Sequence, residues 1–200
     1  MEKRDLQHIQ IYNLNFNYGV INQMITNYLI TGRKGIGKSF LAQRVLKALQ
    51  EDYVGYQTLP YYINEEIRGH YFHSLIPLEE IENDLPFTIR HKKNSCIYNK
   101  EVFDIIGIPC LTKSLLSSKK IVLLDELGVA ESENWNYINR VEELLNSSKI
   151  VIAILKKVDS AFISKIKNRT DITLIDLDDT AQEIAFKELV EKIGGKLNEK

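Results

Sequence analysis

Residues 32–39 read Gly32-Arg33-Lys34-Gly35-Ile36-Gly37-Lys38-Ser39, which is the spacing Gly-x4-Gly-Lys-Ser. Glycines at these positions allow a narrow turn in which backbone N–H groups point inward and can surround an anion. An aliphatic stretch from about Ile25 to Thr31 predicts a strand before the turn, and apolar residues at helical spacing predict a helix from Ser39 to Gln50. A strand, a glycine loop and a helix in this order indicate a phosphate-binding loop of the Walker A type.

Each part of this loop has a chemical task. The partial positive charge at the helix N-terminus favours a phosphate, and the Lys38 ammonium would lie on the β- and γ-phosphates and assist catalysis. The Ser39 hydroxyl would ligate Mg²⁺. We therefore expect a nucleoside triphosphate, ATP or GTP, to be bound together with Mg²⁺ by Gly32, Arg33, Lys34, Gly35, Ile36, Gly37, Lys38, Ser39 and Phe40.

A second acidic motif follows about 86 residues later. Four aliphatic residues, Ile121 to Leu124, predict a buried strand whose carboxyl end delivers Asp125 and Glu126. This is the form of a Walker B strand, in which Asp125 would hold Mg²⁺ directly or through a water molecule. Glu126 would orient or deprotonate the attacking water and is the candidate catalytic base. The simpler alternative is a strand end that carries surface acids.

The rest of the chain predicts one α/β domain over residues 1–200, with a mostly parallel P-loop NTPase sheet flanked by helices. Residues 1–24 form an N-terminal extension that suggests a strand or a hairpin arm, although its frequent asparagines also allow a loop. Residues from about 53 to 107 are predicted as a β-rich hairpin insertion after the first helix. Later elements are predicted as a helix at Leu111–Ser117, a helix at Trp135–Asn146, a strand at Ile150–Leu155, a helix at Ser160–Asn168, a strand at Ile172–Ile175, and a helix that begins at the capping box Thr180-x-x-Glu183 and ends at Gly194-Gly195.

Composition narrows the possible partners and the compartment. The 200 residues carry a net charge of −1, so charge predicts neither a nucleic-acid partner nor an anionic membrane surface. The charged N-terminus lacks an apolar segment of the secretory type, and the aliphatic runs are far shorter than the ~20 residues of a membrane span. Two cysteines, Cys96 and Cys110, are most simply reduced thiols of a cytoplasmic protein.

Several weaker patterns leave alternatives open. Asp125-x-x-Gly128 and Lys157-x-Asp159 give faint support for guanine preference, although the residue before Lys157 is lysine rather than asparagine or threonine. Arg169 could reach the γ-phosphate in cis, but a solvated arginine at a helix end is the simpler interpretation. A nucleotide base could stack on one of four tyrosines, although packing on the sheet is the favoured interpretation: Tyr53, Tyr56, Tyr61 and Tyr62. His70 and His73 could share a metal, although a position on a hairpin surface is favoured.

The chain resembles the THEP1-type nucleoside-triphosphatases, a family of small P-loop proteins. The resemblance spans about Thr26 to the C-terminus. It rests on four segments: the phosphate loop; Val54-Gly55-Tyr56 through Glu65-Glu66-Ile67-Arg68; Asp125-Glu126-Leu127-Gly128-Val129-Ala130-Glu131; and Ile166-Lys167-Asn168-Arg169 running into Asp171-Ile172-Thr173-Leu174. The resemblance implies slow hydrolysis of several nucleoside triphosphates and adds Glu131 to the possible site residues.

Three functions compete at this point. The first is hydrolysis of the β–γ phosphoanhydride, with Lys38 and Mg²⁺ neutralising charge and Glu126 handling the water. The second is a nucleotide or small-molecule kinase, against which the seven scattered arginines count, because they form no cluster typical of an arginine-rich lid. The third is a nucleotide-gated interaction module with little turnover, whose protein partner the sequence does not identify.

Overall fold

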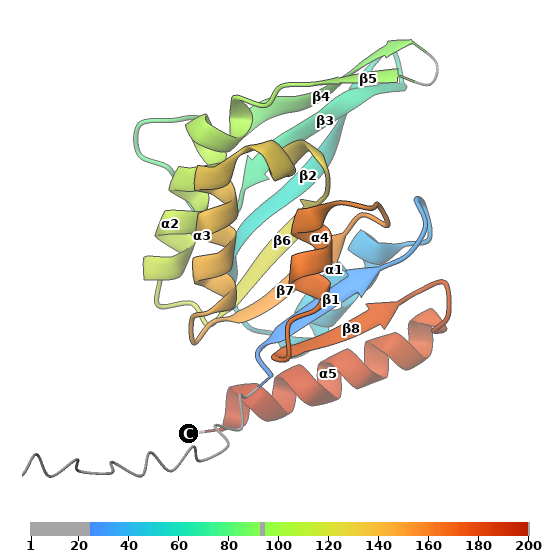
Figure 1. Ribbon diagram of the computed structural model, residues 1–200, viewed down its shortest axis with the longest axis vertical. Coiled ribbons are helices and arrows are strands. Elements are labelled where there is room, and N and C mark those ends of the chain that lie inside the picture. Colours follow the sequence, from blue (N-terminus) through green and yellow to red (C-terminus); the bar gives the residue numbers. More distant parts are fainter. Residues whose placement is uncertain (1–24, 93–94, 200) are drawn as a thin grey trace, which may run out of the picture.

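The computed structural model describes residues 25–92 and 95–199, which form an eight-stranded sheet with helices on both faces (Figure 1). The strands are β1 (Asn27–Thr31), β2 (Tyr53–Ile63), β3 (Glu66–Ser74), β4 (Asp84–Lys92), β5 (Ser95–Tyr98), β6 (Ile121–Leu127), β7 (Ile150–Leu155) and β8 (Ile172–Asp176). They are ordered β5-β4-β3-β2-β6-β7-β1-β8 across the sheet. The prediction of a mostly parallel α/β sheet is confirmed for this part of the chain.

Helices connect most of the parallel strands. They are α1 (Lys38–Leu49), a π-helical turn η1 (Phe103–Gly107), α2 (Ile108–Leu116), a 3₁₀ turn η2 (Ala130–Glu133), α3 (Trp135–Leu145), α4 (Ala161–Lys167) and α5 (Gln182–Asn198). Helices α1 and α5 cover one face of the sheet, whereas α2, α3 and α4 cover the other (Figure 1). The result is a three-layer arrangement with the sheet in the middle.

Five neighbouring strands, β2-β6-β7-β1-β8, run parallel and are called the parallel half below. The aliphatic runs of β1, β6 and β7 are buried on both faces, because side chains alternate between the two helical layers. In β6, Ile121 and Leu123 pack with α1 and α5, while Val122 and Leu124 pack with α2, α3 and α4. Since parallel strands share one carboxyl edge, the residues after β1, β6 and β7 are brought together there.

The remaining strands, β3, β4 and β5, pair antiparallel and are called the antiparallel half below. The expected β-rich hairpin insertion over about 53–107 differs from the structure in two details. Strand β2 belongs to the parallel half through its pairing with β6, and β3 to β5 continue the same sheet beyond it. The last residues of the segment, Phe103–Gly107, are helical and lead directly into α2.

The ends of two helices also differ from the sequence prediction. Helix α2 begins at Ile108, three residues before the predicted start, with a proline in its first turn, a position that tolerates proline well. Helix α5 begins at Gln182 without a side-chain cap, because Glu183 pairs with Arg44 of α1 instead of closing a capping box. It continues to Asn198, because Leu197, beyond the glycine pair, still packs against the α1 layer of the core.

The N-terminal 24 residues, for which a strand or hairpin arm was expected, lie outside the described residues. Within residues 25–92 and 95–199, no helix has both the length and the apolar character needed to cross a membrane.

Candidate active site

The phosphate loop connects β1 to α1 at the carboxyl edge of the sheet. Gly32, Gly35 and Gly37 all have positive φ angles of 140°, 81° and 98°. A Cβ atom on Gly37 would also lie 2.3 Å from Nε2 of Gln182, the side chain that donates a 2.6 Å hydrogen bond to the Ile36 carbonyl. Glycine at this position is therefore required by the backbone conformation, and the first turn of α5 supports the loop.

Lys38, the first residue of α1, is buried and folds back across the loop. Its Nζ atom donates hydrogen bonds to the carbonyl oxygens of Gly32 at 3.0 Å and Arg33 at 3.3 Å. The same Nζ lies 3.5 Å from Oε1 of Glu126. A buried ammonium held by neutral carbonyls and one carboxylate can interact with an incoming phosphate without moving far.

Ser39 and Asp125 form an oxygen-rich pair between α1 and β6. The Ser39 hydroxyl donates to Oδ1 of Asp125 at 3.1 Å. Burial raises the pKa of the Asp125 carboxyl to about 7, although the Ser39 hydrogen bond opposes that shift. Mg²⁺ prefers oxygen ligands and uses few protein carboxylates, and it would supply the counter-charge that the buried Asp125 lacks. The chemistry of this pair therefore fits a magnesium ion.

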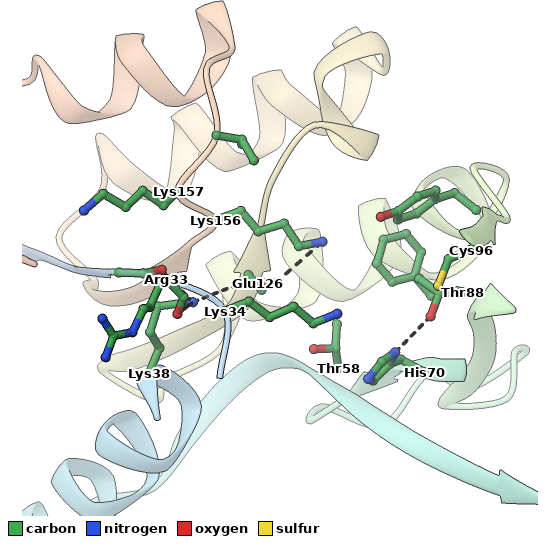
Figure 2. A pocket seen from close by; sticks show the side chains of 14 residues that line it. Arg33, Lys34, Lys38, Thr58, His70, Thr88, Cys96, Glu126, Lys156 and Lys157 are labelled. Atoms are coloured by element: carbon green, nitrogen blue, oxygen red, sulfur yellow. Dashed lines mark hydrogen bonds and ion pairs between the residues drawn. The ribbon is translucent and has the colours of Figure 1, made fainter. Parts of the chain in front are cut away.

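Glu126 follows Asp125 through a cis peptide bond and is only half-buried. Its two carboxylate oxygens face different cations. Lys38 lies beside Oε1, and Lys156, which follows β7, lies 3.6 Å from Oε2 through its Nζ atom. The carboxylate therefore lies between two lysines at the point where β6 and β7 end (Figure 2).

A cavity of about 550 Å³ opens in front of Glu126, within the usual range for small-molecule sites of ~300–1,000 Å³. The phosphate loop and the end of β7 line one side, and the antiparallel half lines the other (Figure 2). Side chains that matter most for the chemistry are Lys34, Lys38, His70, Tyr98, Glu126 and Lys156. The predicted Lys38, Ser39, Asp125 and Glu126 thus gather at one edge of this cavity.

Sequence reasoning missed Lys156 and the wall formed by the antiparallel half. His70 and Thr88 lie on this wall, where the His70 Nδ1 and Thr88 Oγ1 atoms are 2.9 Å apart, and Thr58 of β2 lines the cavity next to them. Burial, assisted by the nearby positive charges of Lys34 and Lys156, lowers the pKa of His70. The available signal was the position of Lys156 directly after a buried strand, since strand ends in parallel sheets carry ligand-binding residues.

Arg169 is not placed where a cis arginine finger would act, so the geometry does not support that less favoured interpretation. It lies before β8 and pairs with Asp171, which in turn accepts a 2.9 Å hydrogen bond from Asn27 at the start of β1. These residues are at the amino ends of the strands, whereas the phosphate loop follows the carboxyl end of β1. Arg169 therefore stabilises the opposite edge of the sheet.

Other predicted residues lie near the site without entering the cavity. Glu131 is buried and accepts a 2.9 Å hydrogen bond from the backbone N–H of Gly128, so it fixes the loop after β6. Phe40 lies in the first turn of α1 with an exposed ring. Tyr56 stacks on Phe72 inside the core, so this tyrosine does not offer a surface for a base.

The faint guanine-reading pattern is not supported by the geometry. The Nζ atom of Lys157 is bound to the carboxylates of Asp176 and Asp178 at 2.9 and 2.8 Å, and this lysine lowers the pKa of the Asp178 carboxyl. The N–H of Gly128 is held by Glu131 rather than exposed to a γ-phosphate. The two histidines considered for a metal have different partners: His73 pairs with Asp84, whereas His70 pairs with Thr88.

Known proteins with the same organisation were found by sequence and by structure. Nucleoside-triphosphatase THEP1 of Thermotoga maritima is 30% identical over 164 residues, which are 81% of this chain and 92% of the relative. The corresponding protein of Methanocaldococcus jannaschii is 26% identical over 170 residues, covering 82% and 95%.

Two solved structures share the fold. The crystal structure of THEP1 from Aquifex aeolicus has a TM-score of 0.64 at 19% identity and covers 82% of this chain and 97% of that one. The solution structure of a human cancer-related nucleoside triphosphatase has a TM-score of 0.68 at 16% identity, covering 87% and 99%. A family model described as NTPase matches residues 27–190. This chain therefore belongs to that NTPase family and is itself similar to the THEP1 nucleoside-triphosphatases in sequence and in fold.

Proposed function

We propose that this protein hydrolyses nucleoside triphosphates to the diphosphate and phosphate in a Mg²⁺-dependent reaction. The observation that carries the proposal is the meeting of Lys38, Ser39, Asp125 and Glu126 at the carboxyl ends of β1 and β6, beside a cavity of small-molecule size. Relatives that are about 30% identical over most of this chain are named nucleoside-triphosphatases, which supports the same reaction here.

Binding follows from the loop and the helix behind it. The positive φ angles of the glycines direct backbone N–H groups toward the loop interior, and the α1 N-terminus adds its partial positive charge. Lys38 can exchange its contacts to Gly32 and Arg33 for the β- and γ-phosphate oxygens. Ser39 and Asp125 would hold Mg²⁺, which supplies neutralisation of the charge on the phosphates when it is bound.

The chemical step needs a base and no covalent intermediate. A water molecule next to Glu126 attacks the γ-phosphorus, and the bond from that phosphorus to the bridging oxygen of the β-phosphate breaks. The proton of the water passes to the Glu126 carboxylate, while Lys38 stabilises the charge that develops on the phosphate oxygens. Glu126 is suited to this role because it is half-buried and lines the cavity, whereas Asp125 is buried behind Ser39.

Broad base preference is part of the proposal. Lys157 is paired with Asp176 and Asp178, and the N–H of Gly128 is held by Glu131. Lys157 is therefore engaged elsewhere than in a guanine-specific contact, and the Gly128 N–H is engaged elsewhere than at a γ-phosphate. We propose that ATP and GTP are both substrates.

The test is phosphate release from ATP, GTP, CTP and UTP with Mg²⁺, with the nucleotide products separated by chromatography. Hydrolysis predicts equal amounts of diphosphate and free phosphate from more than one base. Phosphate found only on an added nucleoside or monophosphate would instead establish a kinase. Tight nucleotide binding without product would favour a nucleotide-gated interaction module and contradict the proposal.

A further inference from the structure

Lys156 has a position that neither motif predicts. It follows β7, the strand between β1 and β6, so its backbone lies between the phosphate loop and the acidic strand end. The Lys156 N–H donates a 2.8 Å hydrogen bond to the Leu127 carbonyl, which fixes the start of the side chain. Its Nζ atom reaches the cavity and lies 3.6 Å from Oε2 of Glu126.

Two neighbours guide the Lys156 side chain into the cavity. Its aliphatic part crosses Gly128 so closely that a Cβ atom on Gly128 would lie 2.6 Å from Cδ of Lys156. Its ammonium lies 5.7 Å from the ring centre of Tyr98 on β5, within the range of a cation–π contact. Gly128 from the parallel half and Tyr98 from the antiparallel half therefore contact the same side chain from two directions.

The next residue shows that this direction is specific to Lys156. Figure 2 shows Lys156 extending toward Glu126, while Lys157 extends away from it. Lys157 ends in ion pairs with Asp176 and Asp178 instead. The chain thus offers two adjacent lysines of equal charge and length, of which one contacts the candidate base.

The pairing around Glu126 indicates what Lys156 does. Two ammonium groups, those of Lys38 and Lys156, lie at 3.5 and 3.6 Å from the two oxygens of one carboxylate. A bound triphosphate brings more negative charge than one carboxylate, so its terminal oxygens attract both lysines. When the two ammonium groups move from Glu126 to the phosphate, the Glu126 oxygens are free to accept a hydrogen bond from a water molecule.

We propose that Lys156 is a catalytic cation supplied in cis, which contacts the γ-phosphate from the end of β7 and releases Glu126 to act on water. The inference rests on the proposed hydrolysis. In the reaction the water proton goes to Glu126, the bond to the β-phosphate breaks, and Lys156 keeps its proton while stabilising the γ-phosphate oxygens. Lys156 thus supplies the positive charge at the γ-phosphate that Arg169, at the opposite edge of the sheet, does not supply.

The experiment compares Lys156→Met, Lys156→Arg and Lys157→Met in the full chain. Methionine keeps the aliphatic part that covers Gly128 and removes only the charge. For each variant, kcat and KM are measured with Mg²⁺ and ATP. Equilibrium affinities are measured for ADP and for the β,γ-imido analogue of ATP, because ADP lacks the γ-phosphate.

For Lys156→Met we expect kcat to fall by about 10²-fold or more, as for loss of a transition-state charge contact. The affinity for ADP stays unchanged, while the preference for the imido analogue over ADP shrinks by about tenfold. Lys156→Arg restores part of kcat, and Lys157→Met stays within about twofold of the wild type, since its ion pairs are exposed.

Equal kcat for Lys156→Met and Lys157→Met would overturn the inference, as would an unchanged preference for the imido analogue. If the wild type releases no phosphate, the proposed hydrolysis fails by itself. The comparison of analogue and ADP affinities then still decides whether Lys156 contacts the γ-phosphate.

Discussion

The parallel and antiparallel halves share one sheet but contribute differently to the site. The parallel half carries Lys38, Asp125, Glu126 and Lys156 at its carboxyl edge, where strand direction forces loop ends to meet. The antiparallel half supplies the opposite wall, with His70, Thr88 and Tyr98 lining the cavity. The difference teaches that the chemistry follows from strand direction, whereas the shape of the cavity depends on three strands that contain neither Walker motif.

The largest effect is expected from Lys38→Ala in the parallel half. It removes the buried ammonium beside Glu126, and with it the charge placed at the β- and γ-phosphates. We expect the turnover number to fall by at least about 10²-fold, with weaker nucleotide binding. Steady-state phosphate release and nucleotide titration measure both, and near-normal turnover would show that the chemistry is not located in the parallel half.

Gly55→Ala should disrupt the pairing of β2 with β6 inside the parallel half, next to the strand on which the antiparallel half is built. Gly55 lies in β2, has a φ of 106°, and a Cβ atom there would lie 2.0 Å from the Leu123 carbonyl oxygen of β6. We expect a loss of about 2–5 kcal/mol in the free energy of unfolding, from backbone strain and overpacking together. Urea unfolding followed by circular dichroism checks this value, and a change below about 0.5 kcal/mol would contradict the close approach.

The two cysteines sharpen the comparison further. Cys96 on β5 is exposed, whereas Cys110 in α2 is buried and donates to the Gly55 carbonyl at 3.0 Å. Burial raises the pKa of the Cys110 thiol from 9.0 to about 11. At pH 8 the fraction of Cys110 present as the reactive thiolate is therefore about 10²-fold lower than for a thiol with the ordinary pKa. With a thiol reagent at pH 8 we expect rapid labelling of one thiol in the folded protein and of two after unfolding. Cys96→Ser should abolish the rapid phase, and rapid labelling of that variant would contradict the assignment.

The smallest effect is expected far from the site, in α5. Gly195 lies in the helix interior, and a Cβ atom there would meet no atom within 4 Å. Gly195→Ala should therefore raise the free energy of unfolding by about 0.5–1 kcal/mol, because alanine favours the helix. The urea experiment used for Gly55→Ala provides the measurement. Comparing the two variants distinguishes a glycine that steric contacts require, Gly55, from one that alanine can replace, Gly195. Destabilisation by Gly195→Ala would mean that α5 is packed more tightly here than the structure shows.

Much of the parallel half could be predicted, because its strands are continuous aliphatic runs. The strand at Ile150–Leu155 agrees at both ends, and β6 extends three residues beyond the predicted Leu124. The antiparallel half was predicted as β-rich, but its union with the main sheet depends on contacts between residues far apart in sequence. The end of α5 was misplaced, because tertiary packing outweighed the tendency of Gly194-Gly195 to end a helix.

The site shows the same division. Motif spacing predicted that Lys38, Ser39, Asp125 and Glu126 would come together, because strand–loop–helix geometry is local and the carboxyl edge of the sheet is shared. Lys156 was missed because its role depends on β7 lying between β1 and β6, an order that no motif states. For Arg169, the sequence left a γ-phosphate contact open as the less favoured interpretation, because the sequence does not tell which edge of the sheet this residue approaches.

The most direct test of the account is turnover by Glu126→Gln, measured beside its affinity for ATP with Mg²⁺. Glutamine keeps the size of the side chain but cannot accept the proton of the water. The account predicts that kcat falls by about 10²- to 10⁴-fold while ATP still binds, because the phosphate loop, Ser39 and Asp125 are unchanged. Turnover equal to that of the wild type would contradict the assignment of Glu126 as the base.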